Sequence, residues 1–180
     1  MAKEKDLIAL WQYKELDSIV GRPTYEKLVW LRKQLTRNAT KVESPFGGGK
    51  TGHAGMVLKP VIFEKKENTA PWNVPESQGT CPIYPAGATE QQKRAIFTKF
   101  TVTEEGIIKA KKMKILLMNQ LVGAVDEDFI MELKDPLMEF DSRSIIEMLD
   151  HLFKNHGELG LQEQEETMDK FNTPPTGAKK

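Results

Sequence analysis

The segment Gly47–Gly52 contains the residue types that come closest to a reactive site. Its last part, Gly49–Thr51, matches the end of a phosphate-binding loop, in which backbone N–H groups and a lysine hold phosphate oxygens. That loop also needs a glycine at position 44, which here is Ser44, a buried strand before it and a helix directly after it. The same residues fit a G-x-G-x-x-G string, again without its strand and helix. We therefore interpret Gly47–Gly52 as a flexible hinge.

Metal binding and nucleophilic catalysis need clusters of side chains that the sequence does not show. His151 and His156 are five residues apart, whereas histidines that converge on one helix face are four apart, and His53 is remote from both. Cys81 is the only cysteine, so no intrachain disulfide and no cysteine-based metal site is expected. A partner for Cys81 from a distant part of the chain stays an open alternative. We predict no catalytic, cofactor or metal site, no small-molecule substrate, and hence no enzyme.

Four lysines in a short stretch could contact nucleic-acid phosphates. They are Lys109, Lys111, Lys112 and Lys114. No aromatic residue lies between them, so stacking on bases is not indicated. A solvated helix face explains the same lysines and is the interpretation that we favour.

Charge and hydropathy exclude several classes of protein. The 180 residues are 39% hydrophobic, no apolar run approaches the roughly 20 residues that span a bilayer, and the N-terminus lacks the apolar core of a signal peptide. We expect a soluble, cytoplasmic protein that does not enter membranes. Residues 1–125 hold 20 Lys and Arg against 12 Asp and Glu, and residues 126–180 hold 6 against 14. Opposite net charges of +8 and −8 would let copies attract each other head to tail, although chance variation explains them equally well.

Helical spacing of apolar residues predicts the elements that hold these side chains. A loose pattern over residues 7–19 ends at Gly21–Pro23, and a clearer stripe from Tyr25 to Val42 predicts a second helix. Thr89 and Gln92 form a capping box before a long helical region that reaches about Val125 and that we expect to break or kink at Gly106. A short helix over residues 129–133 precedes Pro136.

The next predicted helix begins at Ser142 as its N-cap and ends at Gly157. Its apolar stripe belongs to the core by default, but a shell protein would expose part of it to a neighbouring copy. The residues that we assign to such self-association are Ile145, Leu149, Leu152 and Phe153. An acidic stretch over residues 161–171 is a further candidate helix.

The expected fold is mainly α, a bundle of about five to six helices with a long irregular excursion. Residues 1–43 form N-terminal helices, and residues 44–88 are irregular because glycine and proline interrupt any long helix. This stretch is either a partly ordered arm packed on the helices or a mobile excursion. Residues 89–171 form a helical domain, and residues 172–180 a disordered tail.

Short segments in a fixed order carry a resemblance to a known family. They are Gly21–Leu28, Leu31–Leu35, Asn38–Ala39, Val42, Gly47–Gly49, Gly52–His53, Met56–Leu58, Pro85–Thr89, Ala124–Asp126, Leu133–Pro136, Phe140 and Met148–Phe153, with Gly157 at the end. In this order and spacing, over about residues 20–170, the chain resembles the N-terminal, capsid part of Gag-like polyproteins of copia-type LTR retrotransposons.

The resemblance implies a helical protein that assembles into shells and packages RNA. The family places a Cys/His zinc knuckle further along its chain, and a single cysteine cannot supply those ligands. We therefore expect a structural, self-associating protein, possessing no cofactor, whose main partner is another copy of itself. The alternative is a module for binding RNA or another protein through its basic N-terminal part.

Overall fold

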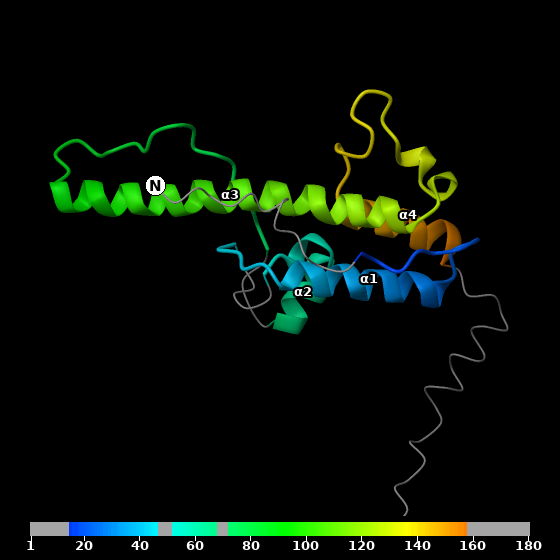
Figure 1. Ribbon diagram of the computed structural model, residues 1–180. Coiled ribbons are helices and arrows are strands. Elements are labelled where there is room, and N and C mark those ends of the chain that lie inside the picture. The colour runs from blue at the N-terminus through cyan, green and yellow to red at the C-terminus, as the bar shows by residue number, and fades with distance from the viewer. Residues whose placement is uncertain (1–14, 47–51, 68–71, 158–180) are drawn as a thin grey trace, which may run out of the picture.

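Helices make up most of the described chain (Figure 1). The computed structural model describes residues 15–46, 52–67 and 72–157. In these residues the α-helices are α1 (Tyr25–Thr40), α2 (Pro60–Glu67), α3 (Glu90–Ala124) and α4 (Ile145–His156). Short 3₁₀ helices are η2 (Ala54–Met56), η3 (Glu127–Phe129) and η4 (Met131–Leu133). The mainly helical class is confirmed, with four α-helices and no β-strand in these ranges rather than five to six helices.

The first predicted helix, residues 7–19, is not helical where the structure describes it. Residues 15–20 run irregularly beside the end of α3, and the Ile19 N–H donates to the Ala124 carbonyl at 2.7 Å. Leu16 and Ile19 are both buried, so their spacing of three residues reflects burial of a non-helical segment. Residues 1–14 lie outside the described residues, as do the predicted helix 161–171 and the tail 172–180.

Helix α1 forms as the apolar stripe predicts. The Thr24 side chain accepts a hydrogen bond from the Lys27 backbone and thereby satisfies one of the free N–H groups of the first turn. Spacings of three and four residues then bury one face of the helix. Its buried residues are Leu28, Leu31, Leu35, Asn38 and Ala39.

Helix α3 begins at the predicted capping box but does not break at Gly106. The Thr89 side chain accepts from the Gln92 backbone, and the Gln92 side chain accepts from the Thr89 backbone. Gly106 lies inside the continuous 35-residue helix, where a Cβ would lie 2.5 Å from Pro45 Cγ and 2.9 Å from the Phe46 ring. The absence of a side chain at Gly106 therefore allows residues 45–46 to lie close to the helix. The predicted break at Gly106 was wrong.

Helix α4 begins two residues later than expected. Ser144 and Glu147 form a capping box, with the Glu147 backbone donating to Ser144 and the Ser144 backbone to Glu147. Ser142 cannot form this box because the residue three positions on is Ile145, which has no side-chain acceptor. Gly157 ends the helix as predicted, while the short helix expected over 129–133 consists of the 3₁₀ turns η3 and η4.

The glycine- and proline-rich stretch 44–88 is partly helical. Pro60 begins α2, a position where a missing N–H costs nothing because the first N–H groups of a helix have no partner within it. Phe63 of α2 is fully buried. Residues 72–88 form no helix and run beside the first half of α3 (Figure 1), and most of residues 76–88 are exposed.

The hydrophobic core lies between α1, the second half of α3, and α4. Its fully buried side chains include Leu28 and Leu35 of α1, Leu117 and Leu121 of α3, and Met148 of α4. Leu16, Ile19 and Ile130 close this core from the irregular segments. In the part of the chain that the structure covers, no helix combines the length and apolar character required to cross a bilayer.

Candidate functional site

The predicted self-association stripe on α4 lies inside the chain's own core. Ile145, Leu149 and Leu152 are buried among α1 and α3, and only Phe153 is partly exposed. The Phe153 ring packs edge-on against Tyr25 at 5.9 Å between centroids, and Arg32 lies 4.9 Å from the same ring. In this fold these residues hold α4 on α1 and leave little apolar surface for a neighbouring copy.

The four lysines predicted to contact nucleic acid do not form one patch. Successive residues of a helix are about 100° apart, which places Lys109 and Lys112 on one flank of α3 and Lys111 and Lys114 on the other. Lys114 donates to the Asp141 carbonyl at 2.8 Å and so helps to hold the segment before α4. The run of lysines in the sequence is therefore divided between two sides of the helix.

Gly52 and His53 close the end of α1. The backbone N–H of His53 donates to the Ala39 carbonyl at 2.9 Å, and its Nδ1 donates to the Val42 carbonyl at 2.9 Å. The carbonyls at the end of a helix lack partners within it, so His53 satisfies two acceptors in this region. Residues 47–51, the glycine run of the predicted hinge, lie outside the described residues.

His53 is fully buried, and its ring is kept neutral. With Nδ1 as the donor to Val42, Nε2 carries the lone pair, and it has no hydrogen-bond partner among the described atoms. The ring packs edge-on against Trp72 at 5.4 Å between centroids. Burial lowers the pKa of His53 below its ordinary value of 6.5, and the positive charge of Lys109 adds to this. Its contacts in the described residues, the Ala39 and Val42 carbonyls and the Trp72 ring, hold the end of α1, so we assign His53 a structural role.

This buried ring predicts a pH-dependent stability. Because the folded pKa is lower than the unfolded one, the stabilisation is fully present above about pH 6.5 and is lost as the pH falls from there toward the folded pKa. We expect urea unfolding to give a smaller free energy of unfolding at about pH 5 than at about pH 7.5. His156, whose pKa burial also lowers, acts in the same direction. The His53→Gln variant should reduce the pH dependence, and an unchanged slope would contradict this assignment of His53.

The other candidate residues for chemistry are also dispersed. His151 lies beside the Phe129 carbonyl at 3.2 Å, and the His156 ring packs edge-on on Phe129 at 4.9 Å between centroids. Cys81 is an exposed free thiol in the irregular segment before α3. Among the described residues, no three His, Cys, Asp or Glu side chains gather as they would around a metal ion.

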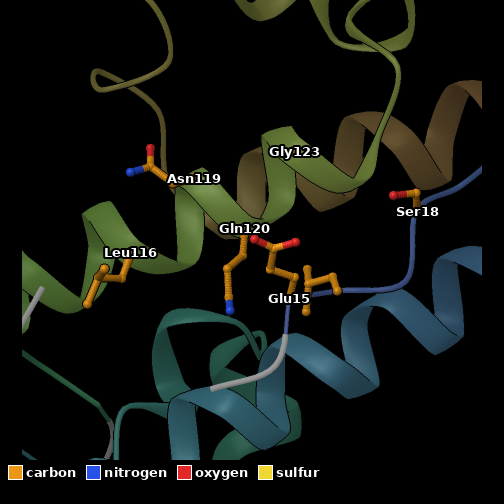
Figure 2. Close-up of a pocket in the computed structure, with 7 residues that line it drawn as sticks. Glu15, Ser18, Leu116, Asn119, Gln120 and Gly123 are labelled. Atoms are coloured by element: carbon orange, nitrogen blue, oxygen red, sulfur yellow. The ribbon is translucent and has the colours of Figure 1, made fainter. Parts of the chain in front are cut away.

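A groove of about 360 Å³ lies between residues 15–18 and α3. Figure 2 shows Glu15 and Gln120 near its centre, with the Ser18 and Asn119 side chains well apart from each other. Gln120 Oε1 accepts from Asn38 Nδ2 at 3.1 Å, which ties it to α1. In Figure 2 the Ser18 hydroxyl lies apart from the Glu15 carboxylate, so the described lining does not hold this hydroxyl against a base.

The first half of α3 projects beyond the bundle. Figure 1 shows this half extending past α1 and α2, with residues 76–88 beside it. We call these residues, 76–88 and Glu90–Glu105, the arm. Glu104 holds its two parts together, accepting from the Ser77 hydroxyl at 2.7 Å and from the Gln78 backbone at 2.8 Å. The first buried residue of α3 is Gly106, so no residue of its first half is fully covered.

The arm nevertheless continues the apolar stripe of the core. Ile96, Phe100, Thr103, Ile107 and Ala110 follow one another at spacings of four and three residues, which places them on one face. Ile107 and Ala110 are buried, whereas Ile96 and Phe100 are only partly covered. Other apolar side chains of the arm are more exposed: Phe97 is 54%, Val102 52% and Ile83 90% exposed. The stripe is thus only partly covered along the arm, and further apolar side chains beside it are exposed.

A second surface combines positive charge with an aromatic ring. Lys33 and Arg37 on the outer face of α1, and Lys41 directly after its end, are exposed and lie four residues apart. The half-exposed Trp30 lies among them, with its Nε1 donating to Asp17 at 3.0 Å and Lys33 Nζ 5.4 Å from the ring centroid. Sequence analysis assigned no role to this row, although its spacing of four residues was a visible signal.

Comparisons with protein-family models, curated proteins and solved structures found no match to this chain.

Proposed function

We propose that this protein is a structural subunit that associates with copies of itself, as the Gag-like sequence pattern implies, and that it is not an enzyme. The arm is the observation that carries the proposal. Its apolar residues Ile96 and Phe100 lie beyond the bundle and are only partly buried by the rest of the chain. In proteins most helical stability comes from packing an amphipathic face, and no buried residue of α3 lies in this half. A second copy would supply that packing, since it carries the same apolar face.

Light scattering across a range of concentrations tests this proposal. We expect the mass to rise from monomer to a larger species, and the Phe100→Glu variant to weaken association by about 30-fold or more because a charge would enter the contact. Phe97→Glu is a second variant at a more exposed position. Gln91→Glu, on another side of the helix, is the matched control that should leave association unchanged. A strict monomer at all concentrations would contradict the proposal.

RNA binding is a second candidate function, supported by the row on the outer face of α1. Cations one turn apart fit a chain of phosphates, and a half-exposed indole ring offers a surface on which a base can stack. The segment lies in the basic N-terminal part of the chain. The four lysines of α3 support RNA binding less, because they lie on two flanks of the helix and cannot all contact the same RNA strand.

Fluorescence anisotropy with a labelled single-stranded RNA oligonucleotide tests the second candidate. Affinity should fall steeply with salt, and Lys33→Glu/Arg37→Glu should weaken binding more than the matched Lys109→Glu/Lys111→Glu pair. Trp30→Ala should weaken it about fivefold or more through lost stacking. Equal losses from both lysine pairs would indicate general charge attraction and no interface on α1.

A further inference from the structure

The apolar stripe of the arm is flanked by charges of opposite sign at its two ends. In α3, Lys93 near the beginning of the arm and Glu104 at its end flank the stripe of Ile96 and Phe100. Arg94 and Glu105 lie on the opposite side of the helix, because successive residues are about 100° apart. Two arms side by side in the same direction would bring like charges together. Two arms in opposite directions bring Lys93 of each copy toward Glu104 of the other.

From this complementarity we infer that the arms of two copies pair antiparallel around a two-fold axis, in the register that places Ile96 of one copy against Phe100 of the other. The inference rests on the proposed self-association and names its partner surface. The contact is isologous, the same face on both copies, which closes the pair.

The spacing along the stripe fits this register. Moving three residues outward from Ile96 and Phe100 puts Lys93 opposite Thr103, with Glu104 as its next neighbour. Within its own helix Lys93 pairs with the exposed Glu90 at 2.8 Å. Moving outward again brings the start of one α3 to Gly106 of the other, where Pro45 and Phe46 begin the body of the protein.

The body of the protein limits the pairing to the arm. Beyond Gly106 the same stripe is covered by the chain itself, as the burial of Ile107 and Ala110 shows. An antiparallel pair can therefore overlap over Glu90–Glu105 and no further, so that each body sits at the outer end of the paired arms. The part of α3 without buried residues, Glu90–Glu105, is thus the same part that the two copies can overlap.

Disulfide cross-linking between copies tests the direction and the register. Two variants are made of the full chain, Lys93→Cys and Thr103→Cys, each with Cys81→Ser to remove the native thiol. On mild oxidation an equal mixture should give the cross-linked pair about tenfold more efficiently than either variant alone, because a disulfide requires Cβ atoms about 3.8 Å apart. Lys99→Cys mixed with Thr103→Cys serves as the matched control and should cross-link poorly.

Light scattering on the same unoxidised samples separates the possible failures. Association accompanied by cross-linking of Lys93→Cys with itself would show parallel arms and overturn the inference, while self-association stands. Association without cross-linking of the mixture would show that the copies meet through another surface. That result overturns the inference and leaves the proposed self-association standing. A monomer in every sample would overturn the proposed function and the inference together.

Discussion

Replacing Leu152 with alanine should lower the free energy of unfolding by about 2–5 kcal/mol. The Leu152 side chain is fully buried between α4 and the rest of the core, so its removal leaves a cavity as well as losing apolar burial. Urea unfolding followed by circular dichroism at 222 nm measures the change. Lys154→Ala, two residues along the same helix and exposed, is the control and should change stability by no more than about 0.5 kcal/mol.

The Leu152 variant also distinguishes two roles for the α4 stripe. If the stripe is core, as its burial indicates, the variant loses stability in a monomer and association is affected only through unfolding. A variant as stable as the wild type but unable to associate would instead place Leu152 at a contact between copies. The temperature of the comparison should be low enough for both proteins to be folded.

Gly52→Ala should cost about 3 kcal/mol of stability, because two separate penalties combine at this residue. Gly52 has φ +53, a left-handed conformation that residues with a Cβ rarely adopt. A Cβ would also collide with the Val42 carbonyl oxygen and lie 2.9 Å from those of Ala39 and Thr40. The loss should appear as a lower urea midpoint with an unchanged slope.

Gly123→Ala is the matched control for this prediction. Gly123 lies inside α3, and a Cβ at this position would have no atom of another residue within 4 Å beyond its own helix backbone and chain neighbours. Alanine there should therefore stabilise the protein by up to about 1 kcal/mol through its higher helix propensity. Opposite signs for the two glycine variants are expected. A Gly52→Ala protein as stable as the wild type would mean that His53 does not need its present position at the end of α1.

Local sequence signals identified the helix starts that depend on a few neighbouring residues. The capping box of Thr89 and Gln92 begins α3 as expected, because each partner is three residues from the other and no distant contact is needed. The same rule applied to Ser144 and Glu147 would have placed the start of α4 correctly. Choosing Ser142 instead overlooked the acceptor that the box requires.

Tertiary contacts decided the features that sequence analysis missed. Gly106 resembles a helix break in the sequence, but its lack of a side chain serves the contact with Pro45 and Phe46, which are distant in the chain. The sequence shows the apolar stripe through Ile96, Phe100 and Ile107. Its spacing of three and four residues is the same within the bundle and beyond it, so the spacing does not indicate which of these residues are buried. Only the positions of Phe46 and of Trp72 and Val74, which pack around Ile107 and Ala110, show where this cover ends.

The candidate sites show the same limit. An apolar stripe indicates that a face is covered but not by what, so Ile145, Leu149 and Leu152 were assigned to a neighbouring copy although α1 and α3 of the same chain cover them. Lysines close together in sequence were treated as one patch, although a helix turns about 100° per residue and separates Lys111 from Lys112.

The unbroken course of α3 fixes a distance as well as a surface. The portion from Glu90 to Glu105 is about 24 Å long at 1.5 Å per residue, and it continues without a joint into the helix that Leu117 and Leu121 anchor in the core. It therefore works as a stiff spacer: two bodies connected through it would sit a set interval apart, and an assembly built from such pairs would be an open framework with gaps between its units.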